Sequence, residues 1–452
     1  MVCVPLNLAG ETLAPLAAMV GTDRDRPEFL VVAQPRDKDL RLRFAHQLAL
    51  PILDYIAACR HSRPRRTAHA VAPQLWVPNR GGIEFLGLLS RAIRFRSTTG
   101  SHSVPIPVPT LGRWLKFLAD RADHPGSALL LAATDVLGQH WATGQSAMED
   151  GNLAALLGWI DPPAGRDGPQ AALEAEDPLT WPPAGPATDP LFDREALVGI
   201  FRDYDHARTD RDRRTARARL ETAVRGQIEP TWELVWRAID LMRALPAGDR
   251  VGTRWARDVK AFQKTDDYIA GDGPPQPKHP NPVNSAREIN WLERAKAEYD
   301  AQRAFDDPLV MAEFRLAGEA FAGTVTAVEI DPRSRRSPQA TITITTNDPV
   351  RLIAETTGLR DHHRPQQKGT ITAVDSGPDQ TRITLRLSKG MGNNSIPIPG
   401  SVPKVNDHVC YTLLSDRYTP TGKFPEPSMT PWTHGGPPPP QIPADGAEEE
   451  WA

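Results

Sequence analysis

A repeated β-strand pattern near the C-terminal end constrains the fold of this chain more than any other feature. Residues 323–329 read Gly-Thr-Val-Thr-Ala-Val-Glu, and residues 369–375 read Gly-Thr-Ile-Thr-Ala-Val-Asp. Each copy is followed by a polar turn and a second alternating run, at residues 341–345 and 381–387. Because alternation of Val or Ile with Thr or Arg is typical of a half-buried strand, each copy predicts a β-hairpin.

A further strand is predicted at residues 407–413, which read Asp-His-Val-Cys-Tyr-Thr-Leu. Isolated hairpins are unstable in water, and a small sheet of at least five strands avoids exposed edges most simply by closing on itself. We therefore expect residues 316–415 to form a small antiparallel β-barrel, OB-like or SH3-like. An ordinary antiparallel sheet packed on the preceding helix, with no binding role, is the alternative.

The first two thirds of the chain are predicted to be mainly α-helical, because apolar residues recur there at three- and four-residue intervals. Residues 29–33 predict one short strand, and the alternate prolines of residues 104–109 predict an extended segment. Helices are expected at residues 40–56, 83–95, 110–123, 127–141, 146–159, 192–225, 231–244, 252–270 and 285–305.

The fold class expected is therefore α+β and multidomain. The length of 452 residues exceeds a single compact core, and the 45 prolines favour linkers between domains. The predicted organisation is a helical domain at residues 1–160, a Pro-, Ala- and Gly-rich linker at 161–190, a second helical unit at 191–315, the barrel at 316–415 and a disordered, Pro-rich acidic tail at 416–452.

The compartment is predicted from the cysteines and the N-terminal segment. Cys3, Cys59 and Cys410 lie far apart and cannot all pair, which favours a reducing compartment. The first residues lack the basic start and apolar stretch of a signal peptide, and no apolar run is long enough to span a membrane. We expect a cytoplasmic protein that does not bind membranes.

The predicted barrel has a local excess of positive charge, although the whole chain has a formal net charge of −3. Residues 323–415 contain 11 Lys or Arg and 8 Asp or Glu. Such a patch can follow a phosphate backbone, and His362, His363 and Tyr411 are expected to add contacts or stacking. Solvated strand faces are also often basic, which is the alternative. The residues predicted to bind nucleic acid are Arg333, Arg335, Arg336, Arg364, Lys368, Arg382, Arg386 and Lys389.

A family resemblance points to the same class of ligand. A helical stalk leading into a small barrel that opens Gly-Thr-Val-x-x-Val-Asp/Glu resembles the accessory barrel of superfamily-one RNA and DNA helicases, or a free-standing OB-type nucleic-acid module. The resemblance covers residues 287–415 and brings no catalytic residues with it. Since the chain has no G-x-x-x-x-G-K-[ST] phosphate loop, it implies single-stranded nucleic acid, or a separately encoded ATPase or nuclease, as partner.

Motifs of catalysis and metal binding do not occur in the sequence. Neither G-x-S-x-G nor H-E-x-x-H is present. Residues 390–395 are glycine-rich but precede Pro-rich sequence instead of a phosphate-binding helix, and the adjacent His362 and His363 lack partners at metal-ligand spacing. We therefore expect no enzyme activity, no cofactor and no metal.

The C-terminal tip places Trp451 after three glutamates. An acidic tip with a terminal aromatic residue can dock into a basic-rimmed pocket, so Trp451 is a candidate anchor for a partner, and a solubilising tail is the alternative. Taken together, the sequence predicts a non-enzymatic accessory protein that binds nucleic acid through its barrel in a replication, repair or defence complex. A scaffold that binds only protein is the alternative.

Overall fold

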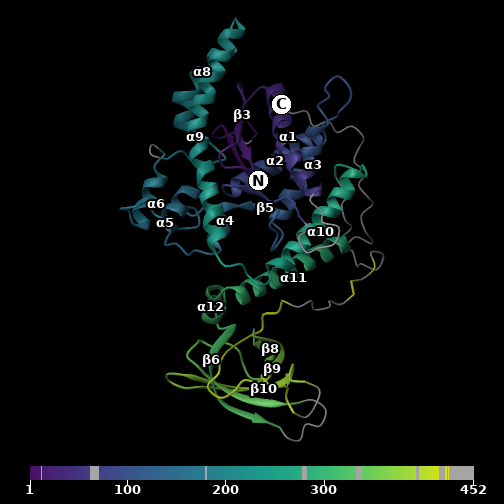
Figure 1. Ribbon diagram of the computed structural model, residues 1–452, viewed down its shortest axis with the longest axis vertical. Coiled ribbons are helices and arrows are strands. Elements are labelled where there is room, and N and C mark those ends of the chain that lie inside the picture. Colours follow the sequence, from purple (N-terminus) through teal and green to yellow (C-terminus); the bar gives the residue numbers. More distant parts are fainter. Residues whose placement is uncertain are drawn as a thin grey trace, which may run out of the picture. The chain divides into compact units, whose positions relative to one another are not determined.

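The computed structural model divides the chain into two compact units, unit 1 at Met1–Pro277 and unit 2 at Lys278–Ala452 (Figure 1). The finer boundaries predicted from the sequence stay predictions. The tail predicted to be disordered lies almost wholly outside the described residues, as does Trp451. The structure describes residues 1–11, 13–61, 71–178, 181–276, 282–331, 338–361, 363–392, 396–416, 423–424 and 426.

Unit 1 is built around a mixed β-sheet. In the part of unit 1 that the structure describes, five strands lie in the order β3-β2-β1-β4-β5. The first three strands form an antiparallel meander, while β1 pairs in parallel with β4, and β4 in parallel with β5. The strands are β1 (Val2–Asn7), β2 (Pro15–Gly21), β3 (Glu28–Val31), β4 (Leu75–Val77) and β5 (Leu130–Ala132).

Helices cover both faces of this sheet (Figure 1). Alternate residues of β1 show the two sides: Val2 and Val4 pack with α9 (Asp210–Ala244), whereas Cys3 packs in the core with α1, α2 and α3. The sheet is therefore the central layer of three. The helices on the Cys3 side are α1 (Lys38–His61), α2 (Arg80–Ile93) and α3 (Pro107–Ala122).

The remaining helices of unit 1 extend these layers. Helices α5 and α6 pack against each other, and buried alanines of α6 contribute to the contact, although α6 falls in the range predicted as a linker. A short π-helical segment at Asp193–Leu197 leads into α8. These helices are α4 (Ala133–Gly138), α5 (Leu153–Ile160), α6 (Gly168–Glu176), α7 (Pro190–Phe192), α8 (Val198–Asp205) and α10 (Val251–Ala270).

Several local predictions for unit 1 are wrong. Of its strands only β3 was expected, because strands buried on both faces are continuous apolar runs without alternation. Residues 127–141, predicted to be a helix, form β5 and then α4. Residues 104–109 were predicted to be extended, but α3 begins at Pro107, because the missing N–H and fixed φ of a proline suit the first helical turn. The two helices expected at 192–225 and 231–244 are replaced by α8 and a continuous α9.

The described part of unit 2 contains two helices and the predicted β-barrel. Helix α11 (Pro282–Asp306) starts at a proline, three residues before the helix expected at residues 285–305. Helix α12 (Pro308–Leu316) follows directly. The strands of unit 2 are β6 (Ala320–Ile330), β7 (Ala340–Thr346), β8 (Thr357–Asp361), β9 (Arg364–Ser376), β10 (Thr381–Lys389) and β11 (His408–Thr412).

The prediction of a small antiparallel barrel is confirmed. Among the described residues, six strands close in the order β10-β7-β6-β11-β8-β9, and every neighbouring pair is antiparallel. The two repeated hairpins join edge to edge, because Ile383 of β10 lies opposite Ile344 of β7. Fully buried side chains such as Ile342, Ile371 and Leu385 fill the interior. The mainly helical character of the chain before the barrel is confirmed as well.

Candidate nucleic-acid interface

The outer surface of the barrel is covered on one side and open on another. Helices α11 and α12 pack over β6 and β11, where Met311, Ala320 and Cys410 share a small apolar core. No comparable core is found over β7, β10 and β9 in the described part of unit 2. We call the outward side chains of these three strands the β7–β10–β9 face.

This face combines cations with hydroxyl groups. The alternation of β10 sends Ile383, Leu385 and Leu387 inward and leaves Arg382 and Arg386 exposed. Residues directly opposite one another in a ladder point to the same side of a sheet, so the register defines its rows. From β7 through β10 to β9 these rows are Thr345 with Arg382 and Asp375, Thr343 with Thr384 and Ala373, and Thr341 with Arg386 and Thr370.

Two lysines extend the face at the end of β10. Lys389 lies opposite Lys368 of β9, next to a bulge in the ladder. Two carboxylates lie near these cations in register. Asp375 of β9 lies opposite Arg382, and Glu329 of β6 lies opposite Thr341 of β7. Within the described residues, no ion pair holds any of the four cations of the face, which are Arg382, Arg386, Lys368 and Lys389.

Arg364, also predicted to bind nucleic acid, has a different environment. Its Nη1 lies 2.6 Å from Oδ2 of Asp361, whose side chain is fully buried, and its Nη2 lies 3.7 Å from Oδ2 of Asp407. Its Nε donates to the carbonyl of Gly400 at 3.1 Å. The guanidinium therefore stabilises the strand ends and the loop around them, and few of its donors remain for a ligand.

Other predicted residues lie outside the described part of the chain, namely Arg333, Arg335, Arg336 and His362. His363 is described and its side chain is exposed. The structure therefore brings together four of the eight predicted cations on one face and separates Arg364 from them.

The expected stacking role of Tyr411 does not agree with the structure. Its side chain is fully buried, and its ring lies against Phe321 with centroids 6.2 Å apart. Its hydroxyl donates to Oε1 of Gln367 at 2.7 Å, and burial raises the pKa of that hydroxyl above its ordinary value. Tyr411 is thus a core residue, and no base can reach it without opening the barrel.

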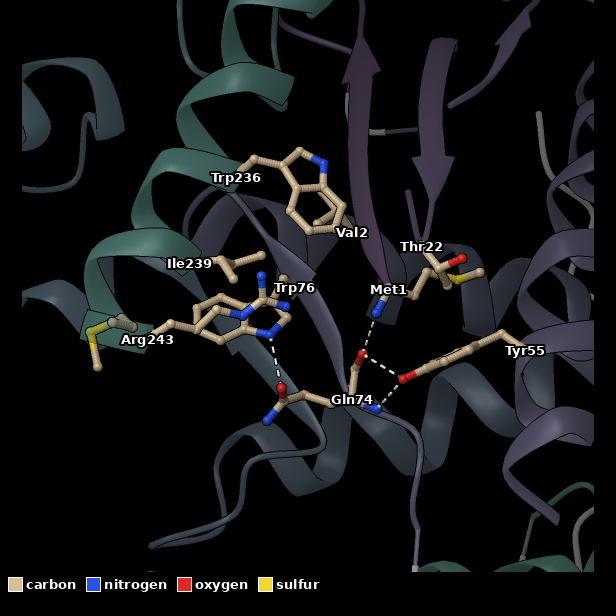
Figure 2. A pocket seen from close by; sticks show the side chains of 10 residues that line it. Met1, Val2, Thr22, Tyr55, Gln74, Trp76, Trp236, Ile239 and Arg243 are labelled. Atoms are coloured by element: carbon tan, nitrogen blue, oxygen red, sulfur yellow. Dashed lines mark hydrogen bonds between the residues drawn. The ribbon is translucent and has the colours of Figure 1, made fainter. Parts of the chain in front are cut away.

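A cavity of about 360 Å³ in unit 1 is a second candidate site (Figure 2). It opens between β1, β4, α1 and α9, with Trp236 and Ile239 on one side and Tyr55 on the other. Its lining residues are Met1, Val2, Thr22, Tyr55, Gln74, Trp76, Trp236, Ile239, Met242 and Arg243.

The polar groups of this cavity mostly bond to one another. The hydroxyl of Tyr55 lies 3.3 Å from the carbonyl of Gln74, and Nε1 of Trp76 donates to Oε1 of Gln74 at 3.0 Å (Figure 2). No side chain in the lining is a carboxylate, an imidazole or a thiol, which are the usual groups for acid–base or nucleophilic chemistry. The cavity has room for a small molecule, and its lining is formed by apolar, aromatic and hydrogen-bonding groups.

The cysteines and the potential metal ligands of the described residues are the other groups of chemical interest. Cys3, Cys59 and Cys410 are buried and free, and burial raises the pKa of Cys3 to about 12 and of Cys410 to about 11, which keeps both thiols protonated. No group of three or more His, Cys, Asp or Glu side chains in the described residues is arranged to hold a metal ion.

No helix in the described part of the chain is long and apolar enough to cross a membrane. In comparisons with known proteins, no family model, no curated protein and no solved structure matches this chain.

Proposed function

We propose that the barrel of unit 2 binds the sugar–phosphate backbone of a nucleic acid through its β7–β10–β9 face. The observation that carries this proposal is the set of four cations on that face without an ion-pair partner among the described residues, set between rows of threonine hydroxyls. Arg, Lys, Ser and Thr are the side chains that most often contact phosphate oxygens in protein–DNA complexes.

The charge distribution favours an anionic polymer. Arg382 and Arg386 lie four residues apart on one strand, a span of about 13 Å at the usual rise of a β-strand. Lys389 and Lys368 continue the cationic surface beyond Arg386. A single small anion cannot contact all of these positions, whereas a nucleic-acid backbone offers a series of phosphates that can.

The binding should be weak and strongly dependent on salt. Each cation that neutralises a phosphate on a duplex releases counterions and lowers log K by about 0.9 per tenfold rise in salt. Four such contacts reduce the affinity about 100-fold between 50 and 200 mM salt. This behaviour suits an accessory protein whose position is also determined by a partner. We propose that it acts without catalysis in a replication, repair or defence complex, beside a separately encoded ATPase or nuclease.

The experiment compares two double variants of the full chain by fluorescence anisotropy with a labelled duplex at 50 mM salt. Arg382→Ala with Arg386→Ala removes two cations from the face and should weaken binding at least about tenfold. Arg351→Ala with Lys404→Ala removes the same charge from exposed positions outside the face and serves as the matched control. Equal effects of the two double variants, or no binding by the wild type to this duplex and to either of its separated strands, would refute the proposal and favour a protein-only scaffold.

A further inference from the structure

The barrel differs in one respect from surfaces that bind single strands by stacking. Residues 316–415 contain only two residues of the type Phe, Tyr or Trp, which are Phe321 and Tyr411. Both side chains are fully buried in the barrel core. This count comes from the complete sequence of the barrel, so it holds for every loop and hairpin tip.

Base stacking on Phe, Tyr or Trp, the side chains with the largest ring surfaces, is therefore not available to the barrel. Proteins that bind single strands without sequence preference combine a cationic groove with such stacking, which holds the flexible strand through its bases. The β7–β10–β9 face has the cations, but the positions between them are threonines: Thr345, Thr343 and Thr341 on β7, Thr384 on β10 and Thr370 on β9. A hydroxyl can donate to a phosphate oxygen or a sugar, but it offers no surface to a base.

We infer that the β7–β10–β9 face selects the double helix over the single strand. The inference rests on the proposed function and adds the class of nucleic acid. Counterion release supports it, since each neutralised phosphate contributes a salt slope of about 0.9 on a duplex and about 0.7 on a single strand. For four contacts and equal affinities at 1 M salt, this difference corresponds to about tenfold tighter binding of the duplex at 50 mM salt.

The rigidity of the β7–β10–β9 face and of the double helix also favours duplex binding. The cations of the face project from paired strands of a closed barrel, so their spacing is fixed by the ladders. A duplex is stiff over a length much greater than this face and presents its phosphates in a fixed array. A single strand must instead lose conformational freedom to align its phosphates with the cations, and no stacking contact offsets that loss.

The test measures binding of the full chain to a 20-base-pair duplex, to either of its strands alone, and to single-stranded oligothymidine and oligoadenine of the same length. We expect the duplex to bind about tenfold more tightly than any single strand at 50 mM salt, and the two homopolymers to bind alike. Arg382→Ala with Arg386→Ala should weaken duplex binding at least about tenfold, while Arg351→Ala with Lys404→Ala should not.

The possible results separate this inference from the proposed function. Equal or tighter binding of single strands, lost with Arg382→Ala and Arg386→Ala, would overturn the duplex preference and leave the proposed function standing. Absence of binding to the duplex and to every single strand, or binding insensitive to both arginines, would overturn the proposed function itself. A preference for the duplex that is lost when both arginines are replaced supports the inference and the proposed function together.

Discussion

The hydroxyl of Tyr411 donates a hydrogen bond to Oε1 of Gln367, 2.7 Å away, inside the closed barrel of unit 2. Gln367 is buried as well, and its Nε2 donates to the carbonyl of Ser401 at 2.8 Å. The pair thus links β11 to β9 and to the loop that precedes β11. It explains why Tyr411 belongs to the core and not to the outer surface of the barrel.

Replacing Tyr411 by Phe should lower stability without changing affinity. Tyr411→Phe leaves the buried Oε1 of Gln367 without its donor, which costs about 1–3 kcal/mol of the free energy of unfolding. Denaturant unfolding of unit 2 measures this loss, and duplex binding of the folded protein should equal that of the wild type. A weaker duplex affinity in the folded Tyr411→Phe protein would contradict the assignment of Tyr411 to the core.

Two arginines of the barrel should respond in opposite ways to substitution by alanine. Arg364→Ala removes the closest cation from the fully buried carboxylate of Asp361 and should cost about 3 kcal/mol in stability. Arg386→Ala, on the exposed face, should change stability by less than about 0.5 kcal/mol but weaken duplex binding. Unfolding curves and binding isotherms of both variants check this, and equal stability losses would be evidence against it.

The Arg315–Asp348 pair predicts how the stability of unit 2 depends on pH. Burial alone would raise the pKa of Asp348, but hydrogen bonds from Arg315 (2.7 and 2.8 Å) and from the backbone N–H of Ala322 (2.7 Å) outweigh it and lower the pKa. A carboxyl whose pKa is lower in the folded state stabilises the fold above its ordinary pKa and loses that contribution in more acidic solution.

Unit 2 should therefore lose stability as the pH falls below about 4. Asp348→Asn should be less stable than the wild type at pH 7, and the difference should shrink between pH 4 and pH 2. Thermal unfolding of both proteins across this range is the measurement. A difference that stays constant with pH would show that Asp348 contributes no charge-dependent stability.

In unit 1, the carboxylate of Asp258 holds α10 against α3 and the following loop. Its side chain is about 1% exposed and accepts hydrogen bonds from Arg121 (2.7 Å), Ser127 (2.8 Å) and the N–H of Ala128 (2.6 Å). Asp258→Ala leaves the largely buried guanidinium of Arg121 without this partner and should destabilise unit 1 by about 3–5 kcal/mol. At temperatures where unit 1 of the Asp258→Ala variant is still folded, its affinity for a duplex should equal that of the wild type. A stability change below 1 kcal/mol would contradict the structural role of Asp258.

The barrel was predictable from the sequence because its hairpins are solvated on one side. In β10, buried Ile383 and Leu385 alternate with exposed Arg382 and Arg386, so the pattern itself separates the core from the surface. Lys368 and Lys389 were identified by the local excess of basic residues, and the bulge between Leu387 and Lys389 lies outside the strict alternation. The pairing of β7 with β10 joins the two hairpins and leaves neither strand as an exposed sheet edge.

In strands covered on both faces, the sequence pattern does not show which side chains point inward. In β11 every residue after His408 is buried, because Tyr411 points into the barrel and Cys410 packs with α12. Alternation is lost there, so the sequence did not show that Tyr411 points inward, and the expected stacking role was wrong. The same reason explains why β1 and β2 of unit 1 were missed. Arg364 lies three residues after Asp361, where β8 pairs with β9, and because no strand was predicted at β8, the sequence did not reveal this ion pair.

The most direct test of phosphate binding by the β7–β10–β9 face is the salt dependence of duplex affinity in three proteins: the wild type, Arg382→Ala with Arg386→Ala, and Arg351→Ala with Lys404→Ala. If Arg382 and Arg386 each neutralise one phosphate, their removal should reduce the magnitude of the slope of log K against log salt by about 1.8, and the control variant should keep the wild-type slope. Identical slopes for all three proteins would contradict phosphate binding by this face.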